Sequence, residues 1–247
     1  MGLMEGRLAV ITAGTAGIGR AVAERFIAEG ADVVITSPSQ AEIDEAIAAL
    51  GEHAIGVVGD ASDVGSLAEL ADAIRTLGRP VDSLFINAGR DVEPTQIVDT
   101  TPEQYDEVMA LNVRGSFFTA QAVVPLMRDG GTIVLTSSIA GSNGGPGHAT
   151  YNASKAAVRS LARTLTAELR GRRIRANAIS PGPTATAGFA KFTGGDPEVE
   201  RAIVDMLPVG HVGLPSELAA AVLFLASDES SYVAGAELVV DGGMSQV

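Results

Sequence analysis

The sequence contains no cysteine and no tryptophan, and only three of its 247 residues are histidine. Without cysteine there is no disulfide framework, no thiolate metal site and no cysteine nucleophile. The three histidines, His53, His148 and His211, are too few to suggest a histidine-rich metal centre. We therefore expect neither a metal ion nor thiol chemistry.

Positive charge is scarce as well. The chain carries 17 lysines and arginines against 30 acidic residues, which gives a formal net charge of −13. Nucleic-acid binding needs a basic face, so this balance argues against a nucleic-acid partner. The hydrophobic fraction of 46% is ordinary for a globular chain and excludes a disordered one.

Long hydrophobic runs are also lacking. The longest clearly apolar run, residues 218–226, has nine residues, whereas a membrane span needs about 20. The first seven residues become charged before the apolar core of a signal peptide is reached. We expect no membrane partner, and a cytoplasmic location is the default expectation.

Short apolar runs rich in valine and isoleucine recur along the chain, and turn-forming or polar residues flank them. Runs of this kind are typical of strands that are buried on both faces of a parallel sheet. They lie at Leu8–Ala13, Val33–Thr36, Ala54–Val58, Ser83–Ile86, Thr132–Thr136, Ile174–Ile179 and Glu237–Val240.

Longer amphipathic stretches separate these runs. In the first stretch Val22, Phe26 and Ile27 share one helical face, and Gly30 follows as a stop signal. The others lie at roughly Gln40–Leu50, Asp63–Leu77, Pro102–Met127, Ala149–Leu169 and Pro215–Ala226. Strands that alternate with helices through right-handed crossovers form a doubly wound open sheet. We predict an α/β protein with seven mainly parallel strands and helices on both faces, forming one domain over residues 1–247.

The segment 184–212 breaks this rhythm. It is rich in glycine and proline and carries scattered apolar side chains such as Phe189, Phe192 and Met206. One interpretation is a lid that covers a bound substrate, because long loops in compact domains are usually functional. The other is a pair of surface helices with a small apolar face of their own. The two are compatible.

A glycine-rich turn follows the first predicted strand: Thr12-Ala-Gly-Thr-Ala-Gly-Ile-Gly19. A helix that begins there offers unpaired N–H groups and a positive dipole end to a pyrophosphate. Glycine lets the backbone approach the phosphates closely. The turn therefore favours a dinucleotide site, and the alternative is a tight turn without a ligand.

This turn resembles the T-G-x-x-x-G-x-G motif of the short-chain dehydrogenase/reductase family. Thr12, Gly17 and Gly19 match, whereas Ala13 stands in place of the first glycine. Because Gly14 follows directly, we expect the turn to survive with a small adjustment.

Other landmarks of the same family follow in order along almost the whole chain. Ser138 lies thirteen residues before Tyr151, which begins a Y-x-x-x-K motif ending at Lys155. Further matches are Asp60, Asn87-Ala-Gly89, Asn112, Pro181-Gly-Pro-Thr-Ala-Thr186 and Val240-Asp-Gly-Gly243. So many ordered matches leave little room for chance.

The resemblance implies a Rossmann-type sheet, an NAD(H) or NADP(H) cofactor and assembly as a homotetramer or homodimer. The catalytic residues it implies are Asn112, Ser138, Tyr151 and Lys155. The cofactor-binding residues it implies are Gly14, Thr15, Gly17, Ile18, Gly19, Ser37, Asp60, Ala61, Asn87, Ala88, Gly89, Tyr151, Lys155, Pro181, Gly182, Thr184 and Thr186.

Tyr151 and Lys155 are four residues apart in a helical stretch, so both project from one face. A nearby ammonium should lower the tyrosine pKa and make Tyr151 a usable general acid or base. Ser138 would donate a second hydrogen bond to the substrate oxygen. The resemblance also assigns Lys155 to the nicotinamide ribose and Asn112 to a water that passes protons towards Lys155.

Each of these residues also has a purely structural interpretation. Ser138 can cap the end of a strand, and Asn112 can satisfy a backbone kink in its helix. His148 lies close enough to Tyr151 in sequence to contact substrate, but we do not expect it to be the base, because Tyr151 already fills that role.

The choice between NAD and NADP depends on the end of the second predicted strand. Ser37 stands where an NAD enzyme usually has an acid, and Pro38 stands where an NADP enzyme often has an arginine. No lysine or arginine occurs from residue 26 to residue 74. A 2′-phosphate would lack a cation there, so we favour NAD unless Arg20 or Arg90 reaches this place.

We therefore predict an NAD(P)-dependent oxidoreductase that transfers a hydride between the nicotinamide and a small-molecule ketone or secondary alcohol. One alternative is an epimerase or lyase that uses the same pocket. The other is a protein that senses NAD(P) without catalysis on the same fold. The sequence does not name the substrate.

Overall fold

The computed structural model describes residues 2–247 and is built on one seven-stranded sheet. All strand pairs are parallel and the order is 3-2-1-4-5-6-7, which confirms the predicted doubly wound fold. The strands are β1 (Leu8–Ile11), β2 (Asp32–Ser37), β3 (Ala54–Val58), β4 (Val81–Ile86), β5 (Met127–Thr136), β6 (Arg175–Pro181) and β7 (Glu237–Val240).

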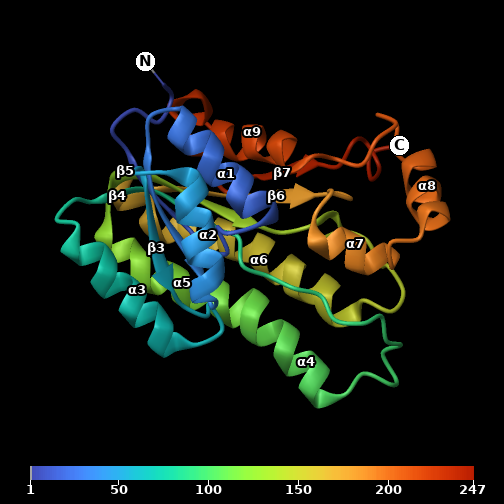
Figure 1. Cartoon of the computed structure of the whole chain (residues 1–247). Helices are drawn as coiled ribbons and strands as arrows, with labels where there is room; N and C mark the ends of the chain where they lie inside the picture. The colour runs from blue at the N-terminus through green and yellow to red at the C-terminus, as the bar shows by residue number, and fades with distance from the viewer. Residues whose placement is uncertain (1) are drawn as a thin grey trace.

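Helices cover both faces of the sheet (Figure 1). One face packs against α1 (Gly17–Ala28), α2 (Gln40–Leu50) and α9 (Pro215–Ala226). The other packs against α3 (Val64–Thr76), α5 (Ser116–Val123) and α6 (Ala149–Glu168). The remaining α-helices are α4 (Pro102–Met109), α7 (Ala187–Thr193) and α8 (Pro197–Asp205).

The two-residue alternation of a strand separates the core into two layers. In β1, Ala9 and Ile11 join the cluster under α1 and α9, whereas Leu8 and Val10 join the cluster under α3 and α6. All four side chains are almost completely buried. This two-sided burial explains why the strands read as continuous apolar runs.

The predicted single helix over Pro102–Met127 is wrong. Helix α4 begins at a capping box between Thr101 and Gln104, but it gives way to a π-helical turn at Ala110–Gly115 before α5 begins. A short 3-10 turn then leads into β5, which starts at Met127. A Cβ at Gly115 would lie 2.6 Å from the carbonyl oxygen of Ala61, so close packing on the loop after β3 accompanies the interruption.

The segment 184–212 contains the two surface helices α7 and α8. The buried side chains of these helices are Thr193 in α7 and Ile203 in α8. An isolated parallel bridge joins Thr184 to Gly213 at the base of the segment. The interpretation as two surface helices is therefore confirmed.

None of the helices described within residues 2–247 combines the length and the apolarity that a bilayer crossing demands.

Candidate active site

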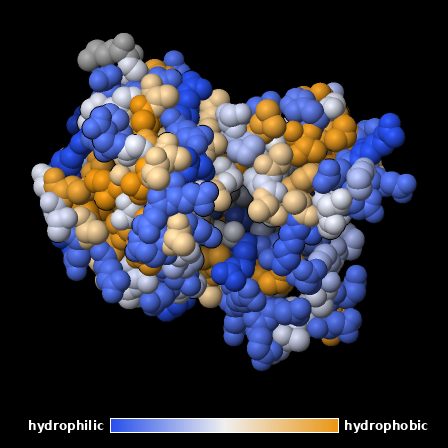
Figure 2. Space-filling model, viewed as in Figure 1, coloured by the Kyte–Doolittle hydropathy of each residue, from blue (hydrophilic) through white to orange (hydrophobic). Residues whose placement is uncertain are grey.

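The sequence-predicted site residues gather at the carboxyl edge of the sheet. The strand order reverses between β1 and β4, and ligands of doubly wound sheets bind outside the strand ends at such a point. The space-filling view shows a hollow in this region, between the part that carries α1 and α2 and the part that carries α7 and α8 (Figure 2).

The small adjustment expected of the glycine-rich turn lies at Ala13 and not at Gly14. Ala13 itself adopts the left-handed conformation, with a φ of 50°. Gly14 is needed for another reason, because a Cβ there would lie 2.7 Å from Cβ of Ile35 in β2. The backbone of the turn is therefore retained, because Ala13 adopts a left-handed conformation that is more favourable for glycine.

The start of α1 fits the pyrophosphate of a dinucleotide. A Cβ at Gly19 would come within 2.2 Å of the carbonyl oxygen of Ala13, so the helix packs directly on the turn. Gly17 has a φ of 54°, and Ile18 packs against the core. Among residues 2–247 no side chain caps α1, which leaves its first N–H groups and positive dipole end for a phosphate.

Thr12 ties this turn to the end of β4. Its hydroxyl accepts hydrogen bonds from the backbone N–H groups of Asn87 (2.9 Å) and Ala88 (3.1 Å). The Asn87 side chain donates back to the carbonyls of Thr12 and Ala13, both at 3.3 Å. The two sides of the crevice are thus held in a fixed relation, as a rigid binding site requires.

The loop after β6 forms the opposite wall. A Cβ at Gly182 would lie 2.6 Å from Cβ of Asp241, and the Thr184 hydroxyl donates to the carbonyl of Gly182, the residue that follows Pro181. Thr186 caps α7 by accepting from the N–H of Phe189 at 3.3 Å. Its methyl group would lie 3.3 Å from a Cβ at Gly17, which brings this loop next to the glycine-rich turn.

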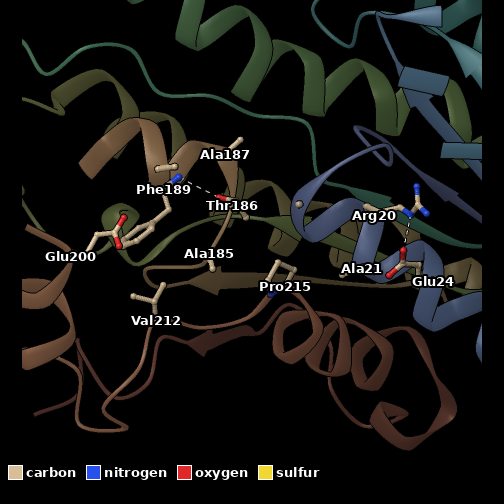
Figure 3. A pocket seen from close by; sticks show the side chains of 12 residues that line it. Arg20, Ala21, Glu24, Ala185, Thr186, Ala187, Phe189, Glu200, Val212 and Pro215 are labelled. Carbon is tan, nitrogen blue, oxygen red and sulfur yellow. Dashed lines mark hydrogen bonds and ion pairs between the residues drawn. The ribbon is translucent and has the colours of Figure 1, made fainter. Parts of the chain in front are cut away.

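A groove runs from this contact between α1 and the α7–α8 segment (Figure 3). Arg20 and Glu24 lie on the α1 side, and Phe189 and Glu200 lie on the other. Nε of Arg20 donates to Glu24 at 2.8 Å. Arg90, the other arginine considered for a 2′-phosphate, donates to Glu107 at 2.7 Å.

An acid that the sequence did not point to lies next to the end of β2. The hydroxyl of Ser37 donates to Oε2 of Glu42 at 2.6 Å, and the hydroxyl of Thr15 donates to the same oxygen at 3.2 Å. Glu42 lies in the first turn of α2, five residues beyond Ser37, the position at which NAD enzymes usually have an acid. The only available signal was an acid near the start of the following helix.

The residues after β3 lie at the same edge. Oδ1 of Asp60 accepts from the N–H and the hydroxyl of Ser62, both at 2.8 Å. Ala61 is buried, and its carbonyl oxygen faces Gly115 of the π-helical turn. This packing connects the loop after β3 to the turn that carries Asn112.

Ser138, Tyr151 and Lys155 come together beside β5, as predicted. Tyr151 and Lys155 lie on α6, and Nζ of Lys155 is 5.5 Å from the centroid of the Tyr151 ring. The buried ammonium donates to the carbonyl of Thr136 at 2.9 Å. Thr136 ends β5, so the strand that leads to Ser138 also orients the lysine.

The pKa values of this group differ from the sequence expectation. Burial raises the pKa of Tyr151 to about 12, although a side-chain hydrogen bond with Ser138 acts in the opposite direction. Burial lowers the pKa of Lys155 to about 8. The expected lowering of the tyrosine pKa is therefore wrong for the protein without ligand, because desolvation of the phenolate outweighs its neighbours.

Asn112 is buried and lies in the π-helical turn. Its side chain accepts from the N–H of Arg90 and donates to the carbonyl of Arg90, both at 2.8 Å. It also donates to the hydroxyl of Ser154, which donates to the carbonyl of Tyr151. Asn112 thus fixes the loop after β4 against α6 instead of satisfying its own helix.

Gly89 separates Asn112 from Lys155. A Cβ at Gly89 would lie 3.0 Å from Nζ of Lys155 and 3.2 Å from Oδ1 of Asn112. A side chain here would require the ends of Lys155 and Asn112 to shift by a few tenths of an ångström, so the glycine leaves room for both.

His148 and Asp91 form a pair next to the group. Nδ1 of His148 and Oδ2 of Asp91 are 2.6 Å apart, and both residues line a small cavity that Tyr151 also lines. The Asp91 carboxylate raises the pKa of Tyr151 and that of Lys155. The ring of His148 contacts the ring of Phe192 from α7, with centroids 5.9 Å apart.

Comparisons with known proteins agree with this architecture. A family model described as Enoyl-(Acyl carrier protein) reductase matches residues 12–245. Oxidoreductase asL5 of Sarocladium schorii is 39% identical over 246 residues, which cover 99% of this chain and 98% of the relative. Dehydrogenase/reductase SDR family member 4 of Homo sapiens is 37% identical over 243 residues, which cover 96% and 87%.

A solved structure, that of Levodione Reductase, superposes with a TM-score of 0.92 at 31% identity and covers 97% of both chains. The family as a whole uses NAD(P)(H), which the uncapped α1 and the close-packed turn of this chain fit. Because the sequence similarity and the sheet order extend over almost the whole length, this chain belongs to the short-chain dehydrogenase/reductase family and is an oxidoreductase of that family.

Proposed function

We propose that the chain transfers a hydride between a nicotinamide cofactor and the carbonyl or carbinol carbon of a ketone or secondary alcohol. The observation that carries this proposal is the meeting of Ser138 and Tyr151 beside the buried ammonium of Lys155, at the carboxyl edge of the sheet. NAD(P)(H), when bound, supplies the hydride acceptor or donor.

Tyr151 is the proposed general acid and base. With a pKa of about 12 it is protonated at neutral pH, so it can donate its proton to a carbonyl oxygen that is gaining charge. Ser138 offers a second hydroxyl to the same oxygen. In the direction of alcohol oxidation Tyr151 takes the proton back, and the ammonium of Lys155 favours the phenolate that this requires.

The proposed cofactor residues surround the crevice. The pyrophosphate would lie on Gly14, Thr15, Gly17, Ile18 and Gly19, which form the uncapped start of α1 and its turn. The rest of the cofactor would contact the loops at the ends of the next strands and α6. These residues are Ser37, Asp60, Ala61, Asn87, Ala88, Gly89, Tyr151, Lys155, Pro181, Gly182, Thr184 and Thr186.

NAD(H) is the proposed cofactor. Residues 26–74 hold no lysine or arginine, and Arg20 and Arg90 each donate to a glutamate of their own surroundings. A 2′-phosphate therefore meets no free cation from these residues, whereas a 2′-hydroxyl requires none.

We also propose assembly as a homodimer or homotetramer. Tyr105 on α4 and Phe117 on α5 are about half exposed, at 48% and 50%. The likeness to the family, whose members commonly assemble through their helices and last strand, carries this proposal, and these two side chains are candidates for the contact surface. Sedimentation velocity of the purified chain tests this directly.

The experiment that tests the proposed function follows the absorbance of reduced nicotinamide while a panel of ketones and alcohols is screened. Net oxidation or reduction of the cofactor with at least one substrate supports the proposal. Dinucleotide binding without turnover supports the sensor alternative. Conversion of a substrate without net change in the cofactor supports the epimerase or lyase alternative.

A further inference from the structure

One carboxylate oxygen joins two segments of the proposed cofactor site. Oε2 of Glu42 accepts from the hydroxyl of Ser37, the last residue of β2, and from the hydroxyl of Thr15 in the glycine-rich turn. Ser37 is only 2% exposed, so its hydroxyl is fixed by the strand that it ends. Within residues 2–247, both hydrogen bonds to the Glu42 carboxylate end on Oε2, so Oε1 keeps its capacity to accept.

This junction is where the sheet would receive the adenosine ribose. In a dinucleotide-binding sheet the ribose lies beside the glycine-rich turn at the end of the second strand, and an acid there accepts from its 2′-hydroxyl. In this chain the acid comes from α2, and Ser37 occupies the end of β2. Ser37 stands at the position where other enzymes of this fold have the acid. Here it acts as a positioning residue, because its hydroxyl donates a hydrogen bond to Glu42.

We propose that Glu42 determines the cofactor preference by accepting a hydrogen bond from the ribose 2′-hydroxyl of NAD(H) and repelling the 2′-phosphate of NADP(H). This inference rests on the proposed function, because it presupposes dinucleotide binding at this edge. It makes the preference for NAD(H) stronger than the lack of a cation alone would make it.

The surroundings offer a 2′-phosphate no compensation. The hydroxyls of Thr15 and Ser37, two neutral donors at this place, already donate to Glu42. The N–H of Ser39 donates to Ser37, and the Ser39 hydroxyl caps α2 by accepting from the N–H of Glu42. A phosphate would therefore have to displace hydrogen bonds as well as approach a carboxylate.

The test measures dissociation constants of NADH and NADPH by isothermal titration calorimetry for the parent chain and for Glu42→Gln. Glutamine keeps the length and an acceptor oxygen but removes the charge. We expect the affinity for NADPH to rise by about 10-fold or more, and the affinity for NADH to fall by less than about 3-fold. The backbone cap at Ser39 does not depend on the side chain that is changed.

Asp44→Asn is the matched control. Asp44 lies on the same helix, accepts from Gln40 at 2.7 Å, and its substitution changes the net charge equally. We expect this variant to leave the ratio of the two affinities unchanged. Because Glu42 is exposed, the effect of Glu42→Gln should also shrink as the salt concentration rises.

A second variant, Ser37→Ala, removes the donor that orients Glu42 and should shift the ratio in the same direction by a smaller factor. Equal ratios in the parent and Glu42→Gln, or equal shifts in Glu42→Gln and Asp44→Asn, contradict the inference while leaving the proposed function intact. A parent that binds neither dinucleotide contradicts the proposed function and this inference with it.

Discussion

Nδ1 of His148 lies 2.6 Å from Oδ2 of Asp91. His148 comes three residues before Tyr151 in the chain. The Asp91 carboxylate lies near the proposed catalytic group, and its charge raises the pKa of both Tyr151 and Lys155. In the direction of reduction, the proposed chemistry requires protonated Tyr151 and charged Lys155. The rate should therefore be constant below about pH 8 and fall as the pH rises through the pKa of Lys155.

Asp91→Asn should move this decline to lower pH, because the lysine loses a carboxylate that favours its charged form. The measurement is kcat/KM for carbonyl reduction across the pH range. His148→Gln serves as the control, since it removes the ring but keeps the carboxylate, and its decline should stay near that of the parent. An Asp91→Asn profile with an unchanged midpoint would show that the carboxylate does not tune Lys155.

The buried ammonium of Lys155 should cost stability. Its pKa falls from 10.5 to about 8 on folding, so below about pH 8 both states are protonated and the folded state bears the full burial penalty. Lys155→Met should raise the free energy of unfolding near neutral pH by up to about 3 kcal/mol, while abolishing turnover. The lost hydrogen bond to Thr136 reduces this gain.

Urea denaturation at several pH values measures this difference. As the pH rises through 8 towards 10.5, the folded parent loses the proton before the unfolded chain does, and the penalty disappears. The stability gap between the variant and the parent should therefore narrow over that range. A gap that is independent of pH would contradict the assignment of the penalty to the ammonium.

Ala13→Gly should stabilise the chain. The left-handed conformation destabilises a residue with a Cβ by about 1–2 kcal/mol. Glycine avoids this cost but loses more backbone entropy on folding, which destabilises the folded state by about 0.5–1 kcal/mol. The net gain of up to about 1 kcal/mol corresponds to roughly 2–4 °C in the melting temperature. Gly14→Ala is the contrasting variant and should destabilise, because its Cβ would meet Ile35. No gain in Ala13→Gly would show that the turn is not strained.

The segment that contains α7 and α8 should be the most mobile part of the chain without ligand. Its exposed ion pair between Lys191 and Glu93, at 3.3 Å, is worth at most about 1 kcal/mol. Amide hydrogen exchange should be faster there than in the sheet and should slow when cofactor and substrate bind. Protection equal to that of the sheet in the free protein would exclude a lid.

Sequence patterns predicted the sheet because two-sided burial leaves an unmistakable run of apolar residues, as in β1 and β4. They did not predict the π-helical turn around Asn112, because residues 110–115 keep a helical pattern and the interruption accompanies packing of Gly115 on Ala61. A contact between segments distant in the chain is invisible to a local pattern.

For the candidate site, the sequence spacing predicted that Ser138, Tyr151 and Lys155 lie near one another, and the structure places them so. The sequence gives no measure of burial, which dominates the pKa values of Tyr151 and Lys155. The sequence did not predict the role of Glu42, because the turn between β2 and α2 decides whether its carboxylate comes close to Ser37 and Thr15, and the course of that turn is not evident from the sequence.

The central claim is that Tyr151 exchanges the proton while the nicotinamide carries the hydride. The most direct measurement is the steady-state reduction of an accepted carbonyl substrate by NADH in the parent and in Tyr151→Phe, alongside the dissociation constant of NADH for both. We predict a fall in kcat of about 10²- to 10⁴-fold with little change in NADH affinity. Turnover in Tyr151→Phe close to that of the parent would contradict the account.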